Sequence, residues 1–399
     1  MWKTRVTLAA LVVTTAGFLM LQTLLVQRGA SLTSRLEARP VTTSSTPDPP
    51  PFSIGKVHIV TLADDPTRTA ICPLAASVYS QGLVLGVLGW NYSDTFFDGT
   101  SCGPPCQANR GKDNRIGQQK KLHWLHHYFE HHPDLCDDDL VLFTDAWDVV
   151  VNGDTATLTS IFLKQTRGQR GVIFNGEPSC GDSFGIANPY GDKLRSKRWP
   201  IRLERSQTLR YASGHDMCYA VAAKTMTSTA TAGPNWSLGS GGILGDVASI
   251  RAFLRGVHQI RREQEDEYSA NPSASFLFEG DQILFQLAYV RFPEVNALVD
   301  TSAEIFFVLS YNVGDDDFAH FSLPRGCAPE YLAGNVGSAF TYNNVTPVFL
   351  HFPGSAKRHL DTCFLHVARA RAHLRPQQYL IDIDANRHVL VHDLCDNYS

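Results

Sequence analysis

Two aspartates, Asp145 and Asp148, have the residue type and spacing that most clearly indicate chemistry in this sequence. They follow the short apolar run 140–143 and precede the second apolar run 149–151. An apolar run with this β-rich composition predicts a buried strand, and open α/β sheets bind ligands beyond the carboxyl ends of their strands. Two carboxylates this close repel each other unless they share a cation, and oxygen ligands suit Mn²⁺ or Mg²⁺. The pair therefore predicts a divalent metal site.

A solvated acidic turn is the alternative for these two aspartates, and the valine-rich runs on both sides favour the sheet-edge site. The acidic run 137–139 contains the same spacing, but it enters the strand instead of leaving it. This run, like 315–317, therefore predicts a surface loop.

Strands and helices alternate around this predicted site. Four segments predict strands and two predict helices: 57–62, 83–88, 140–143 and 172–175, then 69–81 and 118–132. Leu122, Leu125 and Phe129 share one face of the helix 118–132, and most of its histidines lie opposite, which predicts a solvated histidine face. The alternation predicts an α/β sheet. No second linker is visible, so we expect 56–399 to form one domain.

The first 55 residues are predicted to lie outside that domain. Residues 8–26 carry no charge, whereas Lys3 and Arg5 precede them and Arg28 follows. A spanning helix needs roughly 20 apolar residues, which favours a signal anchor; a cleaved signal peptide is the alternative. We expect a cytosolic tail at 1–7, a single transmembrane helix at 8–26 and a Pro/Ser/Thr-rich stem at 27–55.

Cysteines and glycosylation sequons predict an oxidising lumen for the rest of the chain. All nine cysteines lie beyond the stem, and sequons begin at Asn91, Asn235, Asn344 and Asn397. An odd number of cysteines leaves at least one thiol free or paired between chains, and Cys102 and Cys106 are spaced to close a local loop. The net charge of −4 gives no basic excess for nucleic acid. We expect a single-pass type II protein of the endoplasmic reticulum or Golgi membrane.

Further motifs follow the aspartate pair in order along the chain. They are the segments 174–180, 236–245, 279–285 and 347–357, which contain Asn-Gly-Glu, Leu-Gly-Ser-Gly-Gly, Asp-Gln and His-Phe-Pro-Gly. The ordered series resembles the glycosyltransferase domain of the lysyl hydroxylase family, the procollagen galactosyl- and glucosyltransferases. The resemblance spans about residues 57 to 357 in islands, and it implies a Rossmann-like GT-A fold.

The resemblance also implies roles for individual residues. Asp145, Asp148 and His351 match the three metal ligands of the family, a set compatible with Mn²⁺. Glu177 and Asp281 follow predicted strand ends and are the candidates for carboxylates that face the donor sugar or the acceptor; a fold-stabilising role is the alternative for Glu177. The nucleotide-sugar donor would contact a further set: Thr61, Leu62, Lys120, Trp147, Gly241, Gly242, Gly354 and Lys357.

Within that set, each residue has a separate implied task. Trp147 would stack on uracil, Lys357 would reach the phosphates, and Lys120 matches a Gln-Lys pair near the nucleotide. Thr61 and Leu62 would hold the base through their backbone groups. Gly241 and Gly242 would let the backbone approach the sugar closely.

Three motifs depart from the family pattern. The Asn of Leu-Asn-Ser-Gly-Gly is replaced by Gly239, the run of aspartates before Asp-Gln is reduced, and His351 is followed by Phe-Pro-Gly. The departures concern the sugar-facing parts, so the donor sugar and the acceptor are less defined than the reaction type.

We therefore expect a Mn²⁺-dependent (or Mg²⁺-dependent) glycosyltransferase that moves a hexose from a UDP-sugar, UDP-glucose or UDP-galactose, to a protein or glycan acceptor. Two alternatives stay open. One is a non-catalytic sugar- or nucleotide-binding module with the same fold, and the other is a luminal UDP-sugar hydrolase. Retention of Asp145, Asp148 and His351 favours an active enzyme.

Overall fold

The structure is a computed structural model that describes part of the 399-residue chain. The chain divides into two compact units, Met1–Pro50 and Pro51–Ser399. All described residues belong to the second unit: 52–65, 69–90, 113–178, 180, 198–201, 210–228, 233–270, 281–308, 340–341, 344–353, 357, 360 and 378–395.

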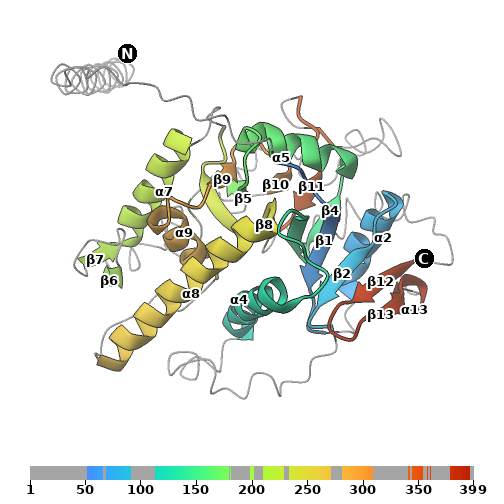
Figure 1. Cartoon of the computed structure of the whole chain (residues 1–399), viewed down its shortest axis with the longest axis horizontal. Coiled ribbons are helices and arrows are strands. Elements are labelled where there is room, and N and C mark those ends of the chain that lie inside the picture. Colours follow the sequence, from blue (N-terminus) through green and yellow to red (C-terminus); the bar gives the residue numbers. More distant parts are fainter. Residues whose placement is uncertain are drawn as a thin grey trace, which may run out of the picture. The chain divides into compact units, whose positions relative to one another are not determined.

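A mixed sheet of eight strands forms the centre of the described part (Figure 1). Its strands, in spatial order, are β13 (Arg387–Leu390), β12 (Tyr379–Asp382), β2 (Leu85–Leu88), β1 (Val57–Leu62), β3 (Leu140–Asp145), β8 (Ser237–Asp246), β5 (Val172–Glu177) and β9 (Ala297–Asp300). β1 is parallel to β2 and β3, whereas β8 runs antiparallel between β3 and β5. The predicted α/β class is confirmed, and the sheet is mixed.

Two smaller sheets accompany it. β10 (Phe306–Val308), β11 (Phe349–His351) and β4 (Val149–Val151) form one, and β6 (Arg198–Ile201) and β7 (Arg210–Ser213) form the other. β11 pairs antiparallel with β4, and the register sets His351 opposite Val149. This pairing brings a late segment of the chain to the turn that follows β3.

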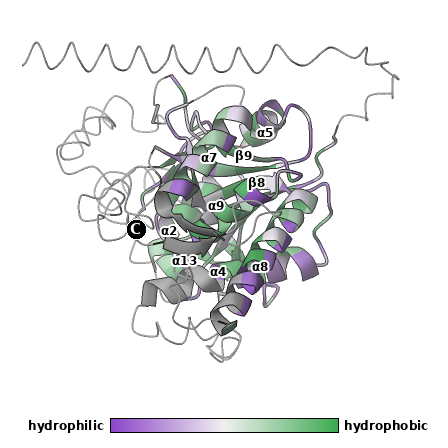
Figure 2. Ribbon diagram, turned by 90° about the vertical axis from the view of Figure 1, so that its left-hand side faces the viewer, coloured by the Kyte–Doolittle hydropathy of each residue, from purple (hydrophilic) through white to green (hydrophobic). Residues whose placement is uncertain are grey.

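Helices pack on both faces of the central sheet (Figures 1 and 2). One hydrophobic core lies between the sheet and α4 (Asp113–His131), α7 (Gly214–Ser228), α8 (Val247–Ala270) and α9 (Asp281–Arg291). The other lies against α2 (Cys72–Ser80), α5 (Leu158–Thr166) and α13 (Val391–Cys395). The short helices η1 (Thr69–Ile71) and η3 (Thr155–Thr157) precede α2 and α5.

The strand β3, which leads to the two aspartates, was predictable because it is buried on both of its faces. Leu140 and Leu142 belong to one core, and Val141 and Phe143 belong to the other. A strand that is buried on both faces has a continuous apolar sequence instead of an alternating one. The predicted strand 140–143 therefore exists, and it continues to Asp145.

The other predicted elements differ from the observed ones mainly at their ends. The first predicted strand is β1, with the same bounds, and 83–88 begins two residues later, as β2. The helix expected at 69–81 is η1 followed by α2, with a proline in the first turn of α2. The helix expected at 118–132 is α4, which begins at Asp113 and ends at His131.

The histidine face of α4 is only partly solvated. His127 and His131 are exposed, as expected, but His126 packs against His258 of α8, with ring centroids 4.1 Å apart. This contact joins α4 to α8 through two imidazoles, so part of the predicted solvated face is an interhelical contact.

Disulfides are present, as the cysteine content predicts. Cys72 is bonded to Cys395 and Cys180 to Cys218, whereas Cys136 is an exposed free thiol. The expected loop of Cys102 and Cys106 lies outside the described residues, as do the predicted anchor 8–26 and nearly all of the stem. Across the described ranges, no helix has the length and apolar character needed to cross a membrane.

Candidate functional site

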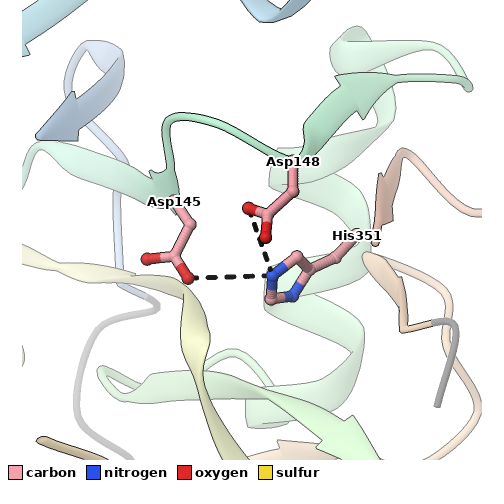
Figure 3. A group of neighbouring side chains, drawn as sticks. All are labelled: Asp145, Asp148 and His351. Atoms are coloured by element: carbon pink, nitrogen blue, oxygen red, sulfur yellow. Dashed lines mark ion pairs between the residues drawn. The ribbon is translucent and has the colours of Figure 1, made fainter. Parts of the chain in front are cut away.

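Asp145, Asp148 and His351 come together beyond the end of β3 (Figure 3). One ligand atom from each residue lies within 4.8 Å of the others. His351 Nε2 is 3.7 Å from Asp145 Oδ2 and 3.6 Å from Asp148 Oδ1. We call these three residues the metal group. The structure thus assembles the set of three residues that the sequence resemblance implied as ligands.

Backbone pairing fixes the position of His351 in this group. Its strand β11 lies beside β4, and the amide of Phe352 donates to the carbonyl of Asp148 at 2.8 Å. Gly241 of β8 makes room for the imidazole, because a Cβ at this position would lie 2.1 Å from His351 Cε1. Gly241 is therefore required for the metal group to assemble in this form.

The chemistry of the metal group fits a divalent cation. His351 and Asp148 are buried, and neither imidazole nitrogen of His351 has a hydrogen-bond partner among the described residues. Burial alone would lower the pKa of His351, but the carboxylates of Asp148 and Asp145 raise it above its ordinary value. Two carboxylates and one imidazole are a donor set compatible with Mn²⁺.

Lys121 extends the site, although the sequence reasoning did not select it. Its buried ammonium is 2.9 Å from Asp145 Oδ1 and 2.5 Å from Asp281 Oδ2, and it donates to the carbonyl of Ser240 at 3.1 Å. Burial would lower the pKa of Lys121, but Asp145 and Asp281 outweigh this effect and raise it. The ammonium therefore stays charged and joins the two carboxylates.

The expectation for the neighbouring Lys120 stays a prediction, because its side chain is not among those described. Helical spacing was the signal that could have found Lys121. This residue lies four positions before the buried Leu125 and seven before the buried Tyr128, so it belongs to the inner face of α4.

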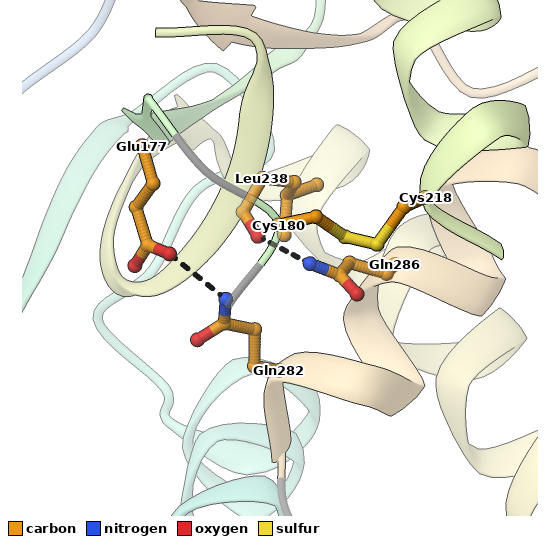
Figure 4. Close-up of a disulfide and its surroundings, with 6 residues drawn as sticks. All are labelled: Glu177, Cys180, Cys218, Leu238, Gln282 and Gln286. Atoms are coloured by element: carbon orange, nitrogen blue, oxygen red, sulfur yellow. Dashed lines mark hydrogen bonds between the residues drawn. A yellow bond between two sulfur atoms is a disulfide. The ribbon is translucent and has the colours of Figure 1, made fainter. Parts of the chain in front are cut away.

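Glu177 and Asp281, the predicted sugar-facing carboxylates, lie in the same region. Asp281 is the first residue of α9 and is buried against Lys121. Glu177 ends β5, and its Oε2 accepts a hydrogen bond from Gln282 Nε2 at 3.1 Å (Figure 4). Successive residues of α9 thus connect Glu177 with Lys121 and, through Lys121, with the metal group.

Two of the predicted nucleotide contacts lie directly beside the metal group. Trp147 is half-buried in the turn between the two aspartates. Lys357 Nζ is 3.1 Å from Asp148 Oδ2, and together with His351 it holds the pKa of Asp148 below its ordinary value despite burial. Gly354 lies outside the described residues.

Three further predicted contacts are placed by the strands. Leu62 is paired with Asp145 in the register of β1 and β3, so it lies at the same sheet edge. Thr61 is fully buried and its hydroxyl donates to the carbonyl of Thr144 at 2.7 Å. A Cβ on Gly242 would lie 2.5 Å from the ring of Phe306, so the open side of Gly242 faces an aromatic ring and not the metal group.

The site carries an excess of negative charge. Four carboxylates and two ammonium groups form it: Asp145, Asp148, Glu177, Asp281, Lys121 and Lys357. Two negative charges remain when His351 is neutral. A divalent cation would balance this charge. The charge balance is therefore a second physical reason why the metal group fits a divalent cation.

No protein-family model and no curated protein matches the sequence. Among solved structures, the chain is similar to the apo structure of the bifunctional glycosyltransferase WbbM, with 12% identity and a TM-score of 0.38 over 80% of this chain and 50% of that one. It is also similar to apo mouse xyloside xylosyltransferase 1, with 11% identity and a TM-score of 0.37; the match covers 76% of this chain and 99% of that one. The chain matches half the length of the WbbM structure. These TM-scores are too low to carry an argument, so the lysyl hydroxylase resemblance stays a prediction.

Proposed function

We propose that the protein is a metal-dependent glycosyltransferase that moves a hexose from a UDP-sugar, UDP-glucose or UDP-galactose, to a protein or glycan acceptor. The observation that carries the proposal is the continuity of the site: the metal group is joined through Lys121 to Asp281, and through α9 to Glu177. A diphosphate and the sugar attached to it need these two neighbouring environments.

The metal group forms the nucleotide half of the site. Asp145, Asp148 and His351 would hold Mn²⁺, or Mg²⁺, which supplies charge neutralisation for the leaving diphosphate. Lys357 lies beside Asp148 and adds a second positive charge for the phosphates. Trp147 lies in the turn between the two aspartates and would stack on uracil.

Glu177 and Asp281 form the sugar half. In the transfer, the acceptor hydroxyl oxygen bonds to the anomeric carbon, the bond from that carbon to the diphosphate oxygen breaks, and the hydroxyl proton moves to a carboxylate. Asp281 is buried and forms an ion pair with Lys121, so its carboxylate is already engaged. Glu177 is less buried and accepts from Gln282, so Glu177 is the better candidate to receive the proton.

The two alternatives predict different products from the same site. A UDP-sugar hydrolase would use water as acceptor, and a binding module would release no UDP. The continuity of Asp281 and Glu177 with the metal group favours an enzyme over a binding module, since a module that only binds nucleotide has no need for these additional carboxylates.

We also propose a luminal, membrane-anchored setting. The disulfides Cys72–Cys395 and Cys180–Cys218 are compatible with an oxidising compartment. Residues 8–26 would provide the single N-terminal membrane helix of a type II protein of the endoplasmic reticulum or Golgi. Alkaline extraction of membranes tests the anchor, because a cleaved signal peptide would release the protein.

The enzymatic proposal is tested by measuring UDP release from UDP-sugars by the purified full chain. We expect release with UDP-glucose or UDP-galactose in Mn²⁺ and none in chelator. An acceptor that raises the rate and gains a hexose identifies a transferase; release that no acceptor changes identifies a hydrolase. Absence of any release with every donor and acceptor, alongside Mn²⁺-dependent UDP binding, identifies the binding module.

A further inference from the structure

The pairing of β5 with β8 is interrupted beside the sugar half of the site. Phe174 is paired with Ile243, but Gly176 is paired with Leu238, so the register shifts at Asn175. Residues 239–242 of β8 therefore lie opposite a single residue of β5, Asn175, and are not regularly paired with that strand. A bulge of this kind redirects a side chain out of the regular sheet pattern.

The side chain of Asn175 occupies this interruption. Asn175 is fully buried, and its Oδ1 accepts a hydrogen bond from the amide of Gly242 at 2.9 Å. Its Nδ2 has no hydrogen-bond partner among the described residues. Folded proteins pair almost all of their buried polar groups, so a buried amide with one end fixed and the other end unpaired indicates a group that is completed by a ligand.

Asn175 and Glu177 converge in front of Gly239. A Cβ built on Gly239 would lie 2.3 Å from Asn175 Nδ2 and 2.5 Å from Glu177 Oε1. Because both atoms lie close to that one point, they are within about 5 Å of each other. The absence of a side chain at Gly239 thus lets a hydrogen-bond donor and an acceptor lie side by side.

This donor and acceptor lie on the face of β8 that carries the metal group. The corresponding Cβ on Gly241, two residues further along β8, would meet His351 Cε1 and lie 3.0 Å from Asp145 Oδ2. Residues two apart on a strand point to the same side. Two other buried polar atoms without a hydrogen-bond partner among the described residues, Ser237 Oγ and Gln286 Oε1, lie on β8 and on α9.

We propose that Asn175 is a specificity-determining residue for the transferred hexose, and this inference rests on the proposed function. Asn175 Nδ2 donates to one sugar hydroxyl while Glu177 Oε1 accepts from the neighbouring one. A hexose with one hydroxyl inverted leaves a buried amide unpaired, which reduces its binding roughly 10- to 100-fold relative to the matching epimer.

The test compares equilibrium binding of UDP, UDP-glucose and UDP-galactose in Mn²⁺ to the full chain and to two variants. Asn175→Asp keeps the acceptor for the Gly242 amide and removes the donor. Asn175→Ser is a smaller, uncharged replacement that also removes the amide donor. Asn296→Asp is the matched control, because Asn296 is a half-buried asparagine remote from the metal group, and its amide donates to the carbonyl of Arg170.

We expect the wild type and the control to discriminate between the two UDP-hexoses by roughly tenfold or more, and both Asn175 variants to lose most of that ratio. Affinity for UDP itself should change less than about twofold, since the metal group is intact. Retention of the wild-type ratio in both variants, or a wild type that does not discriminate, would overturn the inference while leaving the proposed function intact. Absence of Mn²⁺-dependent UDP binding in the wild type would overturn both.

Discussion

Replacement of Lys121 by methionine gives a large effect that can be estimated from the structure. The ammonium lies 2.9 Å from Asp145 and 2.5 Å from Asp281. At an effective dielectric constant of about 20, each pair gains roughly 6 kcal/mol before desolvation is subtracted. Breaking a buried pair leaves an uncompensated charge, and measured costs are about 3–5 kcal/mol. We expect Lys121→Met to lower the free energy of unfolding by that amount.

The same variant should respond more strongly to metal than the wild type does. Mn²⁺ bound at the metal group would return a positive charge to Asp145, one of the two carboxylates that lose their partner. The stabilisation by Mn²⁺ should therefore exceed that of the wild type by about 1 kcal/mol or more. Asp281 would keep its uncompensated charge, so the rescue is partial.

Urea unfolding in chelator and in Mn²⁺ measures both effects. Lys164→Met is the matched control, because Lys164 is exposed and forms a surface ion pair with Glu304. Its removal should cost less than about 1 kcal/mol and leave the metal response unchanged. Equal losses for Lys121→Met and Lys164→Met would refute the assignment of Lys121 as the cation that holds the two carboxylates together.

Acid should destabilise the protein through His258, because burial, His126 and the nearby Arg261 lower its pKa from 6.5 to about 4. The unfolded chain takes up the proton first, so stability falls as pH drops from about 6.5 towards 4, by about 2 kcal/mol at pH 5; urea unfolding of His258→Asn should show a flatter pH dependence. Removal of the Cys180–Cys218 disulfide, with a separation of 38 residues, should cost about 4 kcal/mol in thermal or urea unfolding and reduce UDP release more than UDP affinity. Gly241→Ala should weaken Mn²⁺ binding, measured by electron paramagnetic resonance, because its Cβ would displace the imidazole of the metal group; unchanged affinity would contradict the assigned contact.

The sequence was most informative where local pattern and burial agree. β3 is buried on both faces, so its apolar run and the following aspartate pair were readable without any knowledge of distant contacts. β8 was not predicted as a strand, because glycines usually weaken strands. It forms because the spaces beside Gly241 and Gly242 are filled by His351 and Phe306, which come from other parts of the chain.

The residues of the candidate site also differ in how far local sequence predicts them. Asp145 and Asp148 followed from their position after a strand, whereas His351 came from the family resemblance alone, because its approach depends on the pairing of β11 with β4. Lys121 was missed in favour of the adjacent Lys120. Local motif matching does not distinguish neighbouring lysines, although the helical period places Lys121 on the buried face of α4.

The most direct test of the central claim is the affinity for UDP, measured by calorimetry on the full chain in excess chelator and in Mn²⁺. Asp148→Asn removes one ligand of the metal group, and Asp138→Asn is the control, since Asp138 is an exposed residue paired with Arg170. We predict that Mn²⁺ tightens UDP binding at least about tenfold in the wild type and in Asp138→Asn, but not in Asp148→Asn. Equal UDP affinity of the wild type in chelator and in Mn²⁺ would contradict the claim that Asp145, Asp148 and His351 hold a metal for a nucleotide-sugar.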